Sequence, residues 1–251
     1  MKQSILKFYI SIICVIVSIP TIAQEEINDS IPTNQVVNDS LVLKDKYGLR
    51  VGIDLFKPVY SLIDEDVQGF EIVGDYRITK SLYIAAEIGY MDRYTEEDYL
   101  TFTTEGSYIK AGVNYNLYKN WAGMSNEIYV GIRYGFSPFS QTLHSYSPHF
   151  YGEYFDEIWF ETETEYTGLT AHWAEFVMGI KVEIFNNFYM GGSLGFKKMI
   201  THTQPDNFLN MYVPGFERVY LNETGFSFNY TISYTIPFYK KDKKIENTTE
   251  D

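Results

Sequence analysis

The chain has 251 residues, and its 23 Tyr and 18 Phe make it much richer in aromatic side chains than an average globular protein. Its formal net charge of −13 argues against nucleic acid or an anionic surface as the main partner. After residue 24 there is no apolar run of about 18 residues, which excludes a helical membrane protein. The length fits one eight-stranded barrel with loops, or one soluble β-domain.

Residues 1–23 are typical of a secretory signal peptide. Two lysines precede an apolar run over 8–19, and small residues lead to Ala23. We expect cleavage before Gln24, which removes the single cysteine, Cys14, and leaves a mature chain without a disulfide. That chain has 18 basic and 33 acidic residues, a net charge of −15.

Residues 24–46 are polar, lack periodicity and contain Pro32 and two copies of Asn-Asp-Ser. Such a segment has too little apolar surface to fold by itself. The sequence therefore predicts a flexible periplasmic tether here.

From residue 47 on, apolar and polar residues alternate with a period of two, the pattern of a strand with one face in an apolar environment. The predicted strands cover 47–55, 70–78, 82–90, 109–117, 128–136, 175–184, 188–197 and 226–238. In the first strand we expect Tyr47, Leu49 and Val51 to point outward. The last strand alternates over thirteen residues, and about 9–11 are enough to span a membrane.

The sequence thus predicts an all-β fold, an 8-stranded antiparallel up-and-down transmembrane β-barrel over 47–239, followed by a charged tail at 240–251. Predicted connections alternate between short and long, as outer-membrane barrels require. The short ones are 79–81, 118–127 and 185–187, and we place them in the periplasm with both termini. The long ones are 58–67, 93–105, 139–168 and 201–224, and we place them outside the cell.

Twelve charged residues occupy inward positions of the predicted strands. The basic ones are Arg50, Arg77, Lys110, Arg133, Lys181 and Lys197, and the acidic ones are Asp54, Glu71, Asp75, Glu87, Glu175 and Glu183. Because an eight-stranded barrel is only wide enough for side chains to fill, charges confined there must be paired. We expect this lumen charge network to prevent steady conductance. The alternative, a narrow pore or transporter, predicts unpaired lumen charges of one sign.

The predicted outer connection after the fifth strand is rich in aromatic and acidic residues over 144–166. Exposed aromatics are typical anchors, so one hypothesis is an extracellular ligand at residues 144–166. A second is a divalent ion held by carboxylates, although their spacing does not make them converge. A third is that the strands extend past the membrane as a hairpin with solvated acids.

Some small barrels are lipid-modifying enzymes with His and Ser near the outer rim. If Ile184 lies opposite Phe188, then His172 lies opposite Ile200 and diagonal to His202. No Ser and carboxylate are placed to complete a relay with them. We therefore expect no catalytic residue, cofactor or metal, and keep a lipid-modifying barrel enzyme as the second alternative. A soluble secreted β-domain is disfavoured by the continuously apolar outward faces.

Five stretches carry a family resemblance. They are Gly69 to Arg77 (GFEIVGDYR), Tyr108 to Gly112 (YIKAG), Tyr129 to Gly135 (YVGIRYG), Gly168 to Trp173 (GLTAHW) and Phe228 to Tyr234 (FNYTISY). Over about 47–239 the chain resembles a Bacteroidota outer-membrane β-barrel family known only as a domain of unknown function. The resemblance implies no catalytic residue or ligand. In architecture the chain is similar to small OmpA-type and OmpX-type barrels, which says nothing of function.

If the source is such a bacterium, Asp29-Ser30-Ile31 and Asp39-Ser40-Leu41 resemble the Asp-Ser/Thr-apolar acceptor of periplasmic O-glycosylation in that phylum. We hypothesise a glycan on Ser30 and on Ser40. The alternative is a pair of turn-forming Asp-Ser dipeptides.

The preferred function is a non-enzymatic, monomeric, outer-membrane surface barrel that serves envelope integrity, adhesion or ligand contact through its outer loops. Its expected partners are outer-membrane lipid and the barrel-assembly machinery. Phe238 resembles the C-terminal aromatic signal that this machinery reads, with an extension, 239–251, behind it.

Overall fold

The computed structural model describes residues 44–118, 125–148, 158–206 and 209–242. The predicted signal peptide, Cys14, Ser30 and Ser40 lie outside the described residues, as do residues 243–251 of the predicted tail.

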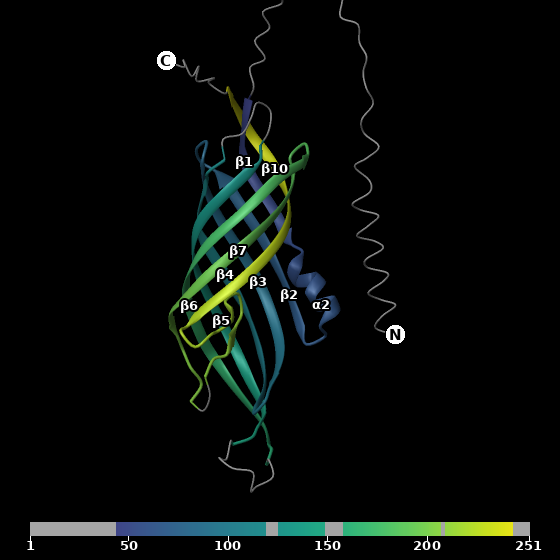
Figure 1. The fold of residues 1–251 in the computed structure, drawn as a ribbon, viewed down its shortest axis with the longest axis vertical. Helices are drawn as coiled ribbons and strands as arrows, with labels where there is room; N and C mark the ends of the chain where they lie inside the picture. The colour runs from purple at the N-terminus through teal and green to yellow at the C-terminus, as the bar shows by residue number, and fades with distance from the viewer. Residues whose placement is uncertain (1–43, 119–124, 149–157, 207–208, 243–251) are drawn as a thin grey trace, which may run out of the picture. The chain divides into compact units, whose positions relative to one another are not determined.

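Eight long strands form one closed antiparallel barrel in the described part of the chain (Figure 1). They are β1 (Lys44–Asp54), β2 (Val67–Arg77), β3 (Leu82–Glu97), β4 (Leu100–Asn116), β5 (Glu127–Tyr146), β6 (Phe160–Phe185), β7 (Phe188–His202) and β10 (Thr224–Asp242). Each pairs with its neighbours along the chain, and β10 pairs with β1 to close the ring. The predicted all-β, eight-stranded antiparallel barrel is confirmed.

Bulky apolar side chains stay exposed on the outward face of every strand because successive residues point to opposite faces. Examples, one from each strand in chain order, are Ile53, Phe70, Ile88, Ile109, Ile132, Ile180, Leu194 and Phe228. We term this ring of side chains the apolar belt. A soluble monomer rarely exposes an apolar surface of this extent, so the belt needs an apolar environment. Among the described residues, no helix is both long and apolar enough to cross a membrane.

The end of the barrel at which β1 starts and β10 ends is termed the inner end, and the opposite end the outer end. Toward the outer end, β3 continues to Glu97 and β4 starts at Leu100, so most of the predicted connection 93–105 is strand. The alternation stops there because outward residues become polar, as at Asp92, although pairing continues.

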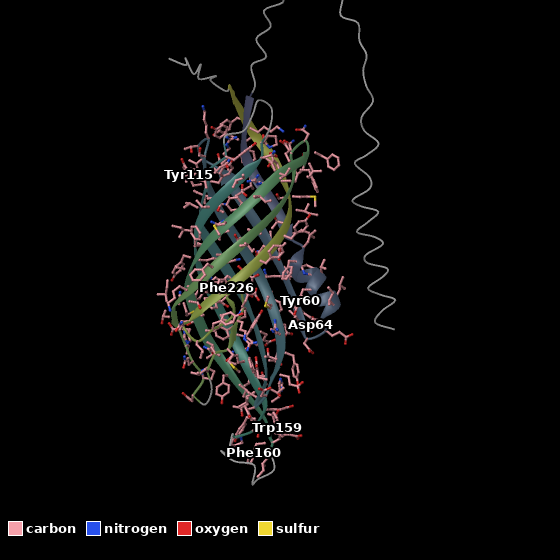
Figure 2. All side chains as sticks on the ribbon, in the orientation of Figure 1. Tyr60, Asp64, Tyr115, Trp159, Phe160 and Phe226 are labelled. Carbon is pink, nitrogen blue, oxygen red and sulfur yellow. The ribbon has the colours of Figure 1, made fainter. Side chains whose placement is uncertain are left out.

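The connection predicted over 139–168 is also mostly strand. β5 and β6 stay paired out to Tyr146 and Phe160, apart from two bulges. Trp159 and Phe160 lie at the outer tip, well beyond Phe226 (Figure 2). The described part of 144–166 therefore forms an extended hairpin, the third of the interpretations above; residues 149–157 lie outside the described residues.

The closing seam begins earlier and ends later than predicted. β1 starts at Lys44, inside the predicted tether 24–46, and β10 runs to Asp242, inside the predicted tail 240–251. Tyr47 pairs with Tyr239 whereas Gly48 pairs with Pro237, so Phe238 is the extra residue of a β-bulge. The prediction that Tyr47 points outward is wrong, because this shift turns its ring inward, where it is 4% exposed.

Two smaller elements lie in the outer connections. The helix α2 (Phe56–Ile63) joins β1 to β2 and lies beside β2 outside the ring of strands (Figure 1). The strands β8 (Tyr212–Val213) and β9 (Glu217–Arg218) form a hairpin between β7 and β10. Leu62 and Ile63 of α2 are more than 70% exposed, whereas Lys57 of the same helix is buried.

Candidate functional site in the barrel interior

An ion cluster lies in the lumen near the inner end. Arg50 donates from Nη2 to Asp75 at 2.8 Å and to Glu127 at 2.9 Å. Lys181 forms a second ion pair with Asp75. The ring of Tyr189 lies 4.8 Å from the guanidinium carbon of Arg50. Each charge in this cluster therefore has an opposite charge beside it, as burial requires.

A second cluster lies around Glu71 at the middle of the barrel. Lys57 donates to its Oε2 at 3.0 Å, and Lys110 forms an ion pair with the same oxygen at 3.2 Å. Tyr108 donates to Oε2 and Asn229 to Oε1, both at 2.6 Å. Glu71 is thus held by four side chains, and its own side chain is fully buried.

The Glu71 cluster extends through both lysines. Lys57 also pairs with Asp54, and Lys110 also pairs with Glu87. Glu87 in turn pairs with Arg133 through Nε at 3.2 Å. Charges of both signs therefore alternate across the middle of the lumen.

The two clusters join eight of the twelve predicted lumen residues. They are Arg50, Asp75, Lys181, Asp54, Glu71, Lys110, Glu87 and Arg133. Glu183 pairs with Lys46 nearer the inner end, and Arg77 donates to the backbone carbonyls of Lys46, Thr79 and Lys80. Glu175 and Lys197 lie directly opposite each other in the register of β6 and β7. Their side chains bind other groups: Lys197 donates to backbone carbonyl oxygens, and Glu175 accepts from Ser227.

Three charged partners were missed by sequence reasoning because they lie outside the predicted strands. They are Lys46, Lys57 and Glu127. Glu127 has the same parity as the inward residues of β5, and this was a signal that could have identified it. Lys57 enters the lumen from α2, which the pattern of the flanking strands does not reveal.

The β8–β9 hairpin folds back into the outer half of the lumen. Val213 and Phe216 are completely buried there. Phe216 meets Trp173 edge-on, with 5.9 Å between ring centroids. Gly215 has a φ of +76°, and a Cβ at this position would lie 2.4 Å from the Tyr108 ring, so glycine is required.

Polar side chains hold the hairpin in place. Lys197, which is 1% exposed, donates from Nζ to the carbonyl oxygens of Gly215 at 2.8 Å and Phe216 at 3.3 Å. Gln141 donates to the carbonyl oxygen of Tyr212 at 3.2 Å. Sequence reasoning treated 201–224 as one long outer connection and did not predict that its hairpin folds into the lumen; the apolar residues Val213 and Phe216 were the available signal.

Ser227 Oγ donates to Glu175 Oε1 at 3.2 Å, while Oε2 of Glu175 is buried without a hydrogen-bond partner among the described residues. Glu175 therefore lies between the charge clusters and the hairpin.

The predicted histidine pair is not formed. Phe188 pairs with Phe185 instead of Ile184, and His172 pairs with Thr201 instead of Ile200, because bulges shift the register of β6 and β7. His202 is opposite the inward-facing Ala171, so it lies on the other face from His172. The prediction of diagonal rim histidines is wrong for this reason.

The contacts of the histidines are to neutral side chains. His172 hydrogen-bonds the hydroxyl of Tyr134 at 2.8 Å, and His202 hydrogen-bonds Gln204 at 2.8 Å. Within the described residues, no group of three or more His, Cys, Asp or Glu side chains is arranged to hold a metal ion.

Strand pairing and interior together define an antiparallel eight-stranded barrel whose lumen is occupied by its own side chains and by one folded-in hairpin. The chain belongs to the family described as a domain of unknown function, DUF6048, whose family model matches residues 5–241. The predicted membership of a family of unknown function is confirmed, and the Bacteroidota origin stays a prediction.

No curated protein matches the chain. Two solved structures are similar at a low level. Neisserial surface protein A (NspA) is 11% identical, with 76% of this chain and 95% of that chain covered and a TM-score of 0.38. Ail, the attachment invasion locus protein of Yersinia pestis, is 8% identical, with 77% and 99% covered and a TM-score of 0.39. The barrel assignment rests on the strand pairing of this chain.

Proposed function

We propose that the protein is a non-enzymatic outer-membrane surface barrel that is closed to steady conductance and that acts through its outer end, in envelope integrity, adhesion or ligand contact. The observation that carries this proposal is the β8–β9 hairpin, whose Val213 and Phe216 are completely buried inside the barrel. The ion clusters of Arg50 and Glu71 form a second closing layer nearer the inner end.

The apolar belt supports a membrane location. On β3 the outward apolar residues run from Leu82 to Tyr90 and give way to Asp92, and on β4 they run from Tyr115 to Ile109, with Glu105 beyond. The span on β3 covers nine residues, within the roughly 9–11 residues of a membrane-crossing strand. We take these stretches as the membrane-spanning segments.

The orientation follows from the lengths of the connections. The inner end carries the start of β1, the end of β10 and short connections such as 186–187, whereas the outer end carries the long hairpins. Outer-membrane barrels have short periplasmic turns and longer extracellular loops. We therefore place the termini in the periplasm and the hairpin of β5 and β6, with its aromatic tip, outside the cell, where it is available to an extracellular ligand.

Paired lumen charges favour a closed barrel over a narrow pore, because ions of one sign find no continuous row of opposite charges. Planar-bilayer recording tests the closed lumen: the reconstituted protein is expected to give no steady channels. Large stable channels would contradict the closed barrel while leaving the membrane location intact.

Fractionation tests the location. The protein should partition with outer membrane and should migrate faster on a gel when it is unheated than after boiling, because folded barrels resist detergent. Recovery from the soluble periplasmic fraction, with identical migration before and after heating, would contradict the proposal.

A further inference from the structure

The barrel wall is incomplete on one side near the outer end. β1 pairs with β10 only as far as Asp54 and Thr231, although β10 continues along β7 to Thr224. On the other side β2 begins at Val67, opposite Arg93, although β3 continues along β4 to Glu97. The edges of β10 and β3 are therefore left without strand partners on this side of the wall.

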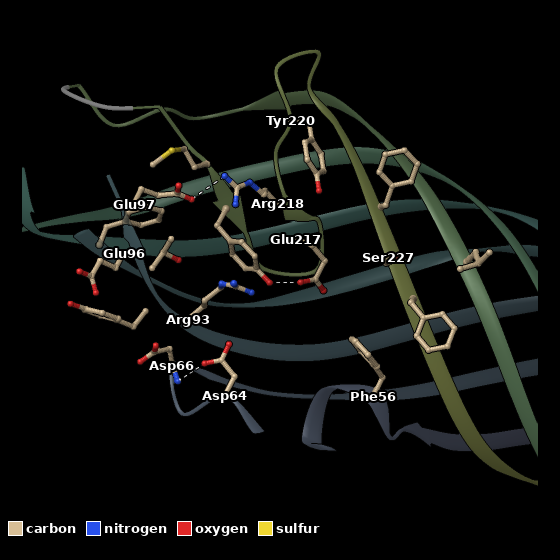
Figure 3. Close-up of a pocket in the computed structure, with 18 residues that line it drawn as sticks. Phe56, Asp64, Asp66, Arg93, Glu96, Glu97, Glu217, Arg218, Tyr220 and Ser227 are labelled. Atoms are coloured by element: carbon tan, nitrogen blue, oxygen red, sulfur yellow. Dashed lines mark hydrogen bonds and ion pairs between the residues drawn. The ribbon is translucent and has the colours of Figure 1, made fainter. Parts of the chain in front are cut away.

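A cavity of about 680 Å³ occupies this opening (Figure 3). Both strand edges, α2 and the β8–β9 hairpin contribute to its lining. Its volume lies within the roughly 300–1,000 Å³ of small-molecule sites. The cavity thus has the size of a ligand site and opens sideways through the wall.

One end of the cavity is apolar and continuous with the apolar belt. Leu194, Phe226 and Phe228 line it and are also exposed on the outward face, at 55%, 59% and 46%. Phe56 of α2 meets Phe228 edge-on, with 5.4 Å between ring centroids. A ligand therefore has direct access to this end of the cavity from the hydrocarbon around the barrel.

The other end is charged and lies level with Asp92, beyond the apolar belt. Figure 3 shows Arg93, Glu96 and Glu97 gathered there, away from Phe56. The whole cavity is lined by five carboxylate side chains and by two guanidinium groups, those of Arg93 and Arg218. This end therefore offers binding partners to both an anionic and a cationic group.

The two arginines differ in how they are engaged. Arg218 pairs with Glu97 at 3.0 Å. Arg93 lies over the ring of Tyr212 at 4.7 Å, and its buried Nε has no hydrogen-bond partner among the described residues. Tyr212 itself donates to Glu217, and burial, followed by the Glu217 carboxylate, raises the pKa of Tyr212 well above its ordinary value. Tyr212 is thus a neutral platform that positions Arg93.

We propose that this lateral cavity binds a membrane phospholipid with a phosphoethanolamine headgroup. The phosphate meets Arg93, the primary ammonium donates to the carboxylates around Glu96, and the acyl chains lie along Phe228. A purely anionic headgroup would meet more carboxylates than guanidinium groups, and a choline headgroup has no N–H to donate. The inference rests on the proposed membrane location, since the apolar end opens into the bilayer.

Native mass spectrometry of the full mature chain tests the site. The protein is released from micelles that contain equal amounts of phosphatidylethanolamine, phosphatidylglycerol and phosphatidylcholine with the same acyl chains. We expect one phosphatidylethanolamine molecule to be retained in preference. Arg93→Gln should lower its retention about tenfold, as expected for loss of a charge-assisted hydrogen bond.

Lys198→Gln is the control, because it also removes one positive charge, from an exposed side chain that does not line the cavity. It should leave retention unchanged. If Arg93→Gln does not fold, Thr95→Trp tests the site by filling the cavity with no change of charge, and it should also lower retention.

Retention of no lipid, equal retention of the three lipids, or preference for phosphatidylglycerol would overturn the proposal, as would unchanged retention in both cavity variants. Lipid retention is measured only on protein that migrates faster on a gel when it is unheated than after boiling. Failure of that migration would therefore contradict the membrane barrel itself, whereas failure of lipid retention by the folded barrel contradicts the lipid site alone.

Discussion

Glu71 is held by four side chains that come from three separate parts of the chain: α2, β4, which supplies two of them, and β10. A buried carboxylate with this many donors is satisfied only while all of them are in place. The interior of the barrel is therefore specified by single residues as well as by the alternation of its strands.

Glu71→Gln should lower the free energy of unfolding by about 3 kcal/mol, because Lys57 and Lys110 each lose one of their two acidic partners in a buried cluster. Urea unfolding of the refolded barrel, followed by tryptophan fluorescence, measures it. Glu165→Gln on the exposed hairpin of β5 and β6 is the control and should change the value by less than about 0.5 kcal/mol. Equal effects of the two substitutions would contradict the role given to Glu71.

Asp92 gives a pH dependence outside the membrane-spanning segments. It is opposite Glu105 in the register, and burial, followed by the Glu105 charge, raises the pKa of Asp92. A carboxyl with a raised pKa in the folded state stabilises the fold below its unfolded pKa, and that stability is lost as the pH rises through the folded pKa.

Asp92→Asn is therefore expected to be more stable than the wild type at neutral pH and nearly equal to it near pH 3, below the unfolded carboxyl pKa of about 3.9. Thermal shifts measured on gels at a series of pH values report the difference. Glu105→Gln should act in the same direction, and the double variant should gain less than the sum of the two. A stability difference that does not vary with pH would refute the coupling.

Sequence reasoning did not predict the β8–β9 hairpin inside the lumen. Val213 and Phe216 pack against residues far away in the chain, such as Tyr108 and Trp173, and no local pattern encodes such contacts. The eight strands, by contrast, were predictable because an apolar environment on one side imposes a period of two. Their outer ends were not predictable, since strand pairing at Asp92 and Glu105 continues where that environment has ended.

Most of the charged residues in the two lumen clusters could be predicted for the same reason. The alternation of inward and outward residues along each strand identified Arg50, Glu71 and the other inward charges. It does not locate a helix residue such as Lys57, which enters the lumen from outside the ring of strands. Parity also fails beyond each bulge, which is why the opposite partner of His172 was wrong.

Lys197→Met should release the hairpin, because both hydrogen bonds from Nζ to its turn are lost. Limited trypsin digestion, with fragments identified by mass, should show cleavage after Arg218 several times faster than in the wild type. Lys198→Met, a change at the adjacent exposed residue, should cleave at the wild-type rate. Equal rates in the two variants would show that Lys197 does not hold the hairpin.

At the scale of the whole molecule, we expect insertion to depend on the seam between β1 and β10. Phe238 is the extra residue of the bulge there; it is 61% exposed and its ring lies 6.3 Å from that of Tyr76. We keep the prediction that it contributes to the signal read by the assembly machinery.

Phe238→Asp should lower the amount of folded protein in the outer membrane, because it places a charge on the lipid-facing side of the seam. Quantification of heat-shifted protein in isolated outer membranes measures this. Phe238→Leu keeps an apolar side chain but loses the ring, and it separates the two roles: normal levels of this variant would assign the effect to apolarity. Normal levels of Phe238→Asp would remove Phe238 from insertion altogether.

The seam also sets an order of events during folding. Its pairs join Lys44 to Asp242, so the ring cannot close until nearly the whole described chain is available. Contacts of such large sequence separation form slowly, and until they form, β1 and β10 each present an unpaired edge. Gly52 allows the two backbones to approach at the seam, since a Cβ there would lie 2.3 Å from the carbonyl oxygen of Ile232. We therefore expect closure of this seam to be a slow step of folding, and the step that a catalyst of assembly would accelerate most.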